Sequence, residues 1–203
     1  MIKTPALSAR VLTQLDGWGL TPPVLQRLGA FAVVWGLFET NLERTVWALT
    51  GENVHGERPS TDRTPLPEWI EELGKPRPLF ATEALAVLAE ASHVAKDLME
   101  YRHAIAHGTL LLIPGAPTFL RNPRWNRVQR ARPSHSAHVD ENLLDMAIVI
   151  SWTLVRVVGA AQTACNNPAE ASALIEMKSE VREARSMANE LRHLDELMNS
   201  EKY

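Results

Sequence analysis

The stretch ALAVLAEASHVAKDLMEYRHAIAHG, residues 84–108, decides the fold because it predicts a long helix with one buried face. Its apolar residues recur at spacings of three and four, which is the period of an amphipathic α-helix. They are Ala84, Val87, Leu88, Ala91, Val94, Ala95, Leu98 and Ile105. We expect this helix to run over 80–107 and to end at Gly108, in the position of a left-handed C-cap.

Further helices are predicted on both sides of this one. Apolar residues at helical spacing continue from Leu28 to Leu49, and Asp140 can cap a later helix. The last helix carries a heptad-like apolar seam, with Leu194 or Asp195 at one seam position, which packs on the bundle or on a second copy. The expected helices cover 5–15, 23–50, 67–74, 140–164 and 168–199.

The segment TLLLIPGAPTFL, residues 109–120, breaks the helical period. Two short apolar runs flank a Pro-Gly turn signal, which predicts a small hairpin or an extended loop. The residues that follow, 121–135, are polar and irregular. The sequence therefore predicts an all-α, up-and-down helical bundle in a single domain over 1–203, with a short extended or hairpin insertion near 109–138.

Composition limits the class of protein. With 203 residues, 45% of them hydrophobic, and a formal net charge of -3, the chain is typical of a soluble globular protein, and the charge argues against a broad electrostatic grip on nucleic acid. The one cysteine, Cys165, excludes an intramolecular disulfide. The N-terminus lacks a signal-peptide core, and the most apolar stretch, 143–161, is interrupted by Asp145 and Arg156. We therefore expect a cytoplasmic protein that does not enter a membrane.

The helix over 80–107 also has a polar face. Arg102 does not belong to it but lies on the margin of the apolar stripe, where a guanidinium must find a partner or face an interface. On an ideal helix Arg102 and His107 point about 140° apart, so two copies packed about a two-fold axis would bring both pairs into one cleft. The polar face, at spacings of three, four or seven, comprises Glu83, Glu90, His93, Asp97, Glu100 and His107.

Arg102 and His107 together suit phosphodiester chemistry. An arginine offers fixed donors that match a phosphate, and a histidine titrates near neutrality and can take or give a proton. No metal ion or other cofactor is needed if the 2′-hydroxyl of RNA is the nucleophile. The two side chains therefore suit phosphodiester cleavage, and no cofactor is expected if the substrate is RNA.

The segment RHAIAHG, residues 102–108, resembles the R-x4-6-H signature of HEPN domains, which often ends in A-H-G. The preceding FETNLERTVWAL, residues 38–49, and the order of the helices are similar to that family over about 23–165, followed by the amphipathic helix over about 168–199. The resemblance implies an all-α bundle, usually a homodimer, and in many members metal-independent RNA cleavage. It also implies a role in a toxin-antitoxin or phage-defence system, with an antitoxin protein as a partner.

The resemblance carries over to three residues. Arg102 would stabilise the phosphate, and His107 would be the catalytic acid or base. His103 would occupy the polar position after the arginine, where asparagine is commonest in the family. The insertion near 109–138 is not a core element of the family, and it could cover or extend the site.

The insertion is rich in cations in an otherwise acidic chain. Interleaved with an aromatic side chain, they could bind single-stranded RNA, or they could form a solvated loop that pairs with the acidic helices. The cations are Arg121, Arg124, Arg127, Arg130 and Arg132, and they are interleaved with Trp125, His135 and His138.

Three more residues are candidates for the same cleft. Glu39 and Asn41 interrupt the apolar part of the helix over 23–50 and either reach the cleft or form an exposed edge, and Tyr101, next to the arginine, either joins the cleft or packs. By their spacing, the tryptophans other than Trp125 are expected mostly to anchor the core.

Two alternatives remain. Glutamate and histidine recur at the Glu-x-x-His spacing of carboxylate-bridged di-metal bundles. Two of the three matches lie on one helix about ten residues, or ~15 Å, apart, which disfavours that arrangement. The second alternative is a non-catalytic HEPN-like module for binding or assembly. The matches are Glu90 with His93, Glu100 with His103, and Glu190 with His193.

Overall fold

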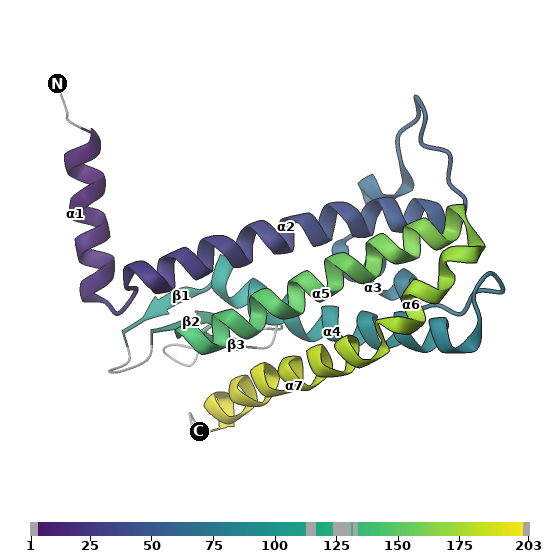
Figure 1. Ribbon diagram of the computed structural model, residues 1–203. Coiled ribbons are helices and arrows are strands. Elements are labelled where there is room, and N and C mark those ends of the chain that lie inside the picture. Colours follow the sequence, from purple (N-terminus) through teal and green to yellow (C-terminus); the bar gives the residue numbers. More distant parts are fainter. Residues whose placement is uncertain (1–3, 113–116, 124–130, 132–133, 201–203) are drawn as a thin grey trace.

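The computed structural model describes residues 4–112, 117–123, 131 and 134–200. It is mostly helical, with a small three-stranded sheet at one end (Figure 1). The bundle consists of the long helices α2 (Pro22–Thr50), α4 (Thr82–His107), α5 (Glu141–Asn166) and α7 (Lys178–Ser200). Shorter elements are α1 (Thr4–Gly17), η1 (Ser60–Arg63) and α3 (Leu66–Leu73). The helices expected over 5–15, 23–50, 67–74, 80–107 and 140–164 are confirmed to within a few residues.

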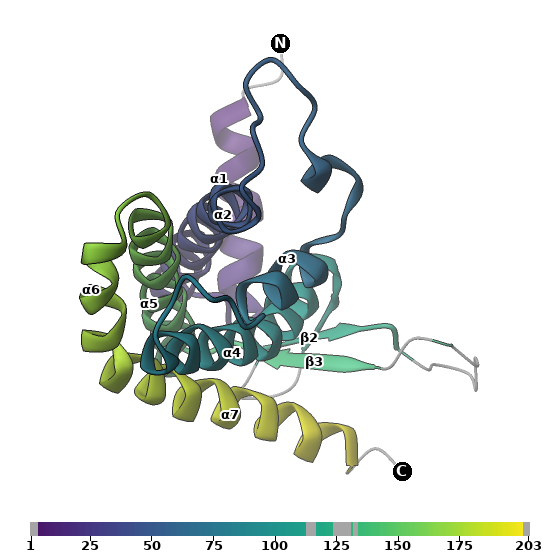
Figure 2. The same ribbon diagram turned by 90° about the vertical axis from the view of Figure 1, so that its right-hand side faces the viewer.

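The long helices run in alternating directions along the chain, from α2 to α4, then α5, then α7 (Figures 1 and 2). Thus α2 runs the same way as α5, and α4 the same way as α7. The two helices of each such pair lie side by side. Arg27, near the start of α2, pairs with Asp145 near the start of α5 at 2.9 Å. Farther along both helices, the Thr45 hydroxyl donates to the Val158 carbonyl at 2.9 Å. These two contacts show that α2 and α5 are parallel. In the same way, α4 and α7 are parallel neighbours.

The core is built mainly from the apolar stripes of α2, α4 and α5. Trp35 is its largest buried side chain, 1% exposed, and its ring lies 5.1 Å from the ring of Phe38. The expectation that most of the tryptophans anchor the core is wrong for Trp18, which is 39% exposed, and for Trp152, which is 51% exposed. Trp152 lies on the exposed stripe of α5 between Asp145 and Arg156, so these two charges, and not the apolar side chain, mark the side that faces outward.

The single helix expected over 168–199 is wrong, because the structure divides this segment into η3 (Pro168–Ala171), α6 (Ser172–Glu176) and α7. The break at Met177 is a tight turn in which the Met177 amide donates to the Leu174 carbonyl at 3.2 Å. Both side chains are buried, so the bend itself serves the core. The apolar seam of α7 packs on α4 and α5 of the same chain.

The insertion forms an antiparallel sheet in the order β1 (Thr109–Leu111), β2 (Thr118–Arg121) and β3 (His135–His138). The hairpin expected over 109–120 is confirmed as β1 and β2. The third strand was missed, since the sequence around it is polar and irregular. Its four residues, HSAH, become a strand because β2 supplies the pairing edge. The expected helical bundle with an extended or hairpin insertion is therefore confirmed in outline, and the insertion is a three-stranded sheet.

Gly108 joins α4 to β1 in a conformation that the sequence did not predict. Its φ of -83° and ψ of 163° are extended, so the expected left-handed C-cap is wrong. A Cβ atom at this position would lie 2.2 Å from the carbonyl oxygen of Ala104 and 3.2 Å from the carbonyl carbon of Leu120. Glycine is needed here because a Cβ atom would overlap the last turn of α4 itself and press against the Leu120 backbone, and not because of its φ angle.

By length and composition α5 could cross a membrane, and half of its most apolar window is buried inside the bundle. A core helix of a soluble protein passes the same test. The contacts of α5 with α2 and α7 give its apolar composition a role in the core.

Replacing Gly108 with alanine is expected to destabilise the protein by about 2 kcal/mol, because the added methyl group overlaps the Ala104 carbonyl and forces the backbone apart. The matched control is Gly159→Ala in α5, where a Cβ meets nothing within 4 Å and alanine favours the helix by about 1 kcal/mol. Urea unfolding followed by circular dichroism measures both. Equal stabilities of the two variants would contradict the close approach.

Candidate functional site

The hairpin folds back over the last two turns of α4 and brings the sheet to the predicted motif. The register pairs Thr109 with Leu120, which places Arg121 beside the junction of α4 and β1. On the next strand His135 is the partner of Arg121. Arg121 and His135 therefore lie next to the polar face of α4 at Glu100, although neither belongs to a helix.

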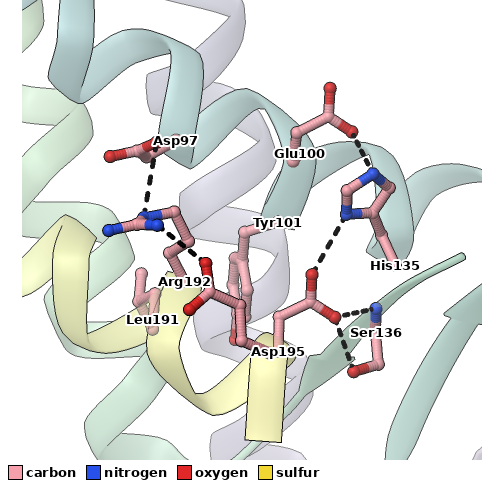
Figure 3. A pocket seen from close by; sticks show the side chains of 9 residues that line it. Asp97, Glu100, Tyr101, His135, Ser136, Leu191, Arg192 and Asp195 are labelled. Atoms are coloured by element: carbon pink, nitrogen blue, oxygen red, sulfur yellow. Dashed lines mark hydrogen bonds and ion pairs between the residues drawn. The ribbon is translucent and has the colours of Figure 1, made fainter. Parts of the chain in front are cut away.

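His135 connects three elements through its two ring nitrogens. Its Nδ1 lies 3.0 Å from Asp195 Oδ2 on α7, and its Nε2 lies 3.5 Å from Glu100 Oε2 on α4 (Figure 3). An ionised carboxylate can accept hydrogen bonds but cannot donate them. Both ring nitrogens of His135 face carboxylates, so this arrangement suits an imidazolium with both nitrogens protonated. The hydrogen bond to Asp195, together with the charge of Glu100, raises the pKa of His135 although burial opposes it.

Asp195, the partner of His135 on α7, makes further contacts with β3. Its Oδ1 accepts hydrogen bonds from the Ser136 amide at 2.5 Å and the Ser136 hydroxyl at 2.8 Å (Figure 3). Burial alone would raise the pKa of Asp195, but the hydrogen bonds from His135 and Ser136 outweigh burial and hold it below its ordinary value. The sequence signal was the acidic residue at a seam position of the last helix, because a half-buried carboxylate needs a partner. We call His135, Asp195 and Ser136 the clamp.

The clamp forms one wall of a pocket between α4, β3 and α7 (Figure 3). Its volume of about 160 Å³ is below that of drug-sized ligand sites. Its charged walls are paired with each other, as in the contact of Arg192 with Asp97 at 3.8 Å. Of the predicted site residues only Tyr101 lines this pocket, and Arg102, His103 and His107 do not.

His103 lies beside the clamp, among two arginines and two other histidines. Burial, followed by the charges of four neighbours, lowers its pKa to about 4, so the ring is neutral at neutral pH. Its Nδ1 is buried and has no hydrogen-bond partner within the described part of the chain. The His103 and His107 rings are 5.9 Å apart. We call His103 and these four neighbours the cationic cluster: Arg102, His103, His107, Arg121 and His135.

Arg102 finds its partner in its own chain. Its Nη2 lies 3.8 Å from Glu39 Oε1 on α2, and both side chains are 30% exposed. Glu39 also accepts a hydrogen bond from the Trp35 indole at 2.5 Å. The ion pair is long and partly exposed, and such pairs contribute on the order of 0–1 kcal/mol. An anion with better geometry can therefore compete with Glu39 for the guanidinium.

The structure sorts the other predicted site residues by position. Asn41 is two residues after Glu39, so it points about 200° away from Glu39 around the axis of α2, on nearly the opposite side of the helix. Tyr101 is a packing residue: it is 6% exposed, its ring lies 6.1 Å from Phe31, and its hydroxyl donates to the His138 carbonyl at 2.6 Å. Burial raises the pKa of its hydroxyl far above the usual range. Arg124, Trp125, Arg127, Arg130 and Arg132 lie outside the described residues.

The carboxylates of the Glu-x-x-His pairs on α4 have arginine partners. Glu90 lies 3.7 Å from Arg185, and Glu100 accepts a hydrogen bond from Arg121 at 3.3 Å. Within the described ranges, no three His, Cys, Asp or Glu side chains are arranged to hold a metal ion.

Comparison of the chain with protein-family models, curated proteins and solved structures gives no significant match. The site is therefore defined by its own geometry.

The clamp makes stability depend on pH. Because the folded pKa of His135 is raised, its contribution is complete below about pH 6.5 and is lost as the pH rises through the folded value. Because the folded pKa of Asp195 is lowered, its contribution is complete above about pH 3.9 and is lost as the pH falls through the folded value. We expect His135→Gln to cost about 2 kcal/mol of unfolding free energy near pH 6, and less at pH 9.

Urea unfolding of the wild type and the variant across this pH range measures the effect. His193→Gln, at an exposed position on α7, the helix that carries Asp195, is the matched control and should leave the profile unchanged. A cost of His135→Gln that does not vary with pH would contradict a charged clamp.

Proposed function

We propose that the chain is a metal-independent endoribonuclease whose reaction takes place at the cationic cluster. The observation that carries the proposal is His103, an imidazole held neutral among four cationic or protonatable neighbours at the end of α4. Such a cluster attracts a phosphate in a protein whose formal net charge is -3. The resemblance of residues 102–108 to the HEPN signature points to the same end of the same helix.

Arg102 binds the scissile phosphate in this proposal. The guanidinium exchanges its long contact with Glu39 for the non-bridging oxygens and stabilises the charge that they develop in the transition state. Arg121, already hydrogen-bonded to Glu100, holds a neighbouring part of the same strand.

His107 and His103 carry the protons. One imidazole takes the proton of the 2′-hydroxyl as its oxygen attacks phosphorus, and the other, in its protonated form, donates a proton to the departing 5′-oxygen. The products are a 2′,3′-cyclic phosphate and a 5′-hydroxyl. His107 is exposed at the helix end, where RNA can reach it, and His103 lies beside it.

In this proposal, binding of RNA changes the pKa of His103. A pKa of about 4 makes the imidazole a weak base, chiefly because of burial and then because of the surrounding cations. A phosphate among these cations offsets their charge, removes the part of the shift that they cause, and so raises the pKa of His103 above its value in the free protein.

Metal-free protein is expected to cleave single-stranded RNA in EDTA. Arg102→Ala and His107→Ala should each reduce the rate by roughly 100-fold or more, because they remove phosphate binding and proton transfer. The reaction is measured in a gel assay with an end-labelled RNA. A second RNA of the same sequence carries 2′-deoxyribose at the cleavage site.

Exposed residues away from the cluster provide the controls. His93→Ala on α4 and Arg44→Ala on α2 remove an exposed side chain of the same type and should retain full activity. Cleavage that persists in both cluster variants, or cleavage at the 2′-deoxy site, would contradict the proposed reaction.

Phosphate binding is also expected to raise the pKa of His103. Titration of its imidazole by NMR, with and without a non-cleavable 2′-deoxy oligonucleotide, measures the shift directly. Affinity for the oligonucleotide should rise as the pH falls from 7 to 5, because the bound state takes up a proton. An unchanged His103 pKa at saturating oligonucleotide would mean that the strand binds elsewhere.

The contact of Arg102 with Glu39 favours a second candidate, a non-catalytic module that binds RNA or a protein partner. In that case the guanidinium stays with Glu39 and does not reach a phosphate. Oligonucleotide binding that raises the His103 pKa, without cleavage of the matching RNA, would select this candidate.

The cellular role that we propose, in a toxin-antitoxin or phage-defence system, rests on the resemblance alone. Growth arrest on expression that requires Arg102 and His107 would support it.

A further inference from the structure

The N-terminal helix α1 stands apart from the bundle (Figures 1 and 2). Several of its large apolar side chains are exposed. From residue 7 to residue 19 every residue except Leu15 is exposed, and Leu15 packs against the core at the base of the helix. Three of the uncovered large side chains, Leu7, Val11 and Trp18, lie on one stripe at helical spacing, and Leu12 lies beside this stripe. We call them the arm: Leu7, Val11, Leu12 and Trp18.

An ordered turn sets the direction of the arm. The Gly19 amide donates to the Asp16 carbonyl at 2.9 Å, and the Leu20 amide donates to the Leu15 carbonyl at 3.0 Å. Gly19 has a φ of +85°, and a Cβ there would lie 2.8 Å from Pro117 Cγ. Leu20 is 4% exposed in the core. These contacts hold α1 across the end of α2, so the arm cannot fold back along its own α2 without breaking them.

A second apolar surface of the same chain is also uncovered. The parallel helices α2 and α5 each expose two large apolar side chains at a similar level along the bundle. Gly36, beside them on α2, has open space where a Cβ would be. We call these four side chains the outer face: Val33, Leu37, Val149 and Trp152, which are 47% to 65% exposed.

The arm and the outer face match in area and in charge. At about half exposure each, their eight side chains present on the order of 800 Å² per chain, which is the area that each partner of a standard interface buries. Glu141 and Asp145 share the single Arg27 near the outer face, which leaves one carboxylate in excess. Arg10 lies on the exposed part of α1, between Leu7 and Val11, and supplies the opposite charge.

We propose that the chain forms a symmetric dimer by exchanging arms: α1 of each copy packs on the outer face of α2 and α5 of the other. A two-fold axis makes both contacts at once, so all eight apolar side chains of each chain are covered and the contact closes. The proposal does not depend on RNA cleavage, because neither surface includes a residue of the cationic cluster.

Sedimentation of the full chain over a range of concentrations tests the dimer. Val11→Glu in the arm and Val33→Glu in the outer face should each raise its dissociation constant about 30-fold or more, since each buries a charge at the centre of the contact. Leu79→Glu is the matched control, at a position 45% exposed that belongs to neither surface, and should leave the constant unchanged. Thermal unfolding confirms that the variants fold.

Crosslinking separates exchange from intrachain folding. A variant with Cys165→Ser, Val11→Cys and Val33→Cys is treated with a short bis-maleimide. Exchange produces a covalent dimer, whereas an arm that folds onto its own chain produces a crosslinked monomer. The proposal is overturned by that monomer, by a chain that is monomeric at every concentration, or by a dimer that neither glutamate substitution weakens.

Discussion

The junction of α4 and β1 at Gly108 leaves no room for a side chain, and it sets the path of the hairpin that follows. A Cβ atom at Gly108 would overlap the Ala104 carbonyl in the last turn of α4 and lie 3.2 Å from the carbonyl carbon of Leu120, so β2 passes close to the end of the helix. This approach turns the hairpin back over α4 and does not let it extend away from the bundle. Consequently Arg121 and His135 lie beside the histidines of α4, and the cationic cluster exists.

Charge within this end of the bundle is balanced by position. Glu100 accepts contacts from both Arg121 and His135, Asp195 faces His135, and Glu39 faces Arg102. Each cation that has a carboxylate partner is held in place by it. His103 receives only the repulsion of these cations and the cost of burial, so it is the group that gives up its proton. One set of contacts thus produces a fixed cationic frame with a neutral imidazole inside it.

His135 belongs to both parts of this arrangement. It lowers the pKa of His103 through its charge, and it anchors the end of α7 through Asp195. One side chain therefore links the end of α7 to the charge around His103.

The sequence by itself determined the helices, because the period of apolar residues along α2, α4 and α5 reflects burial within each segment. It also identified the hairpin from its turn residues, and Arg102, His103 and His107 from their place at a helix end. Only the tertiary structure decided that Glu39 faces Arg102, that Tyr101 packs against Phe31, and that His135 meets Asp195, about sixty residues away. The short strand β3 also depends on β2 for its pairing. Local periodicity records which side of a helix is apolar, whereas the partner of a polar side chain is set by how distant segments pack, and a single sequence carries no local signal of that.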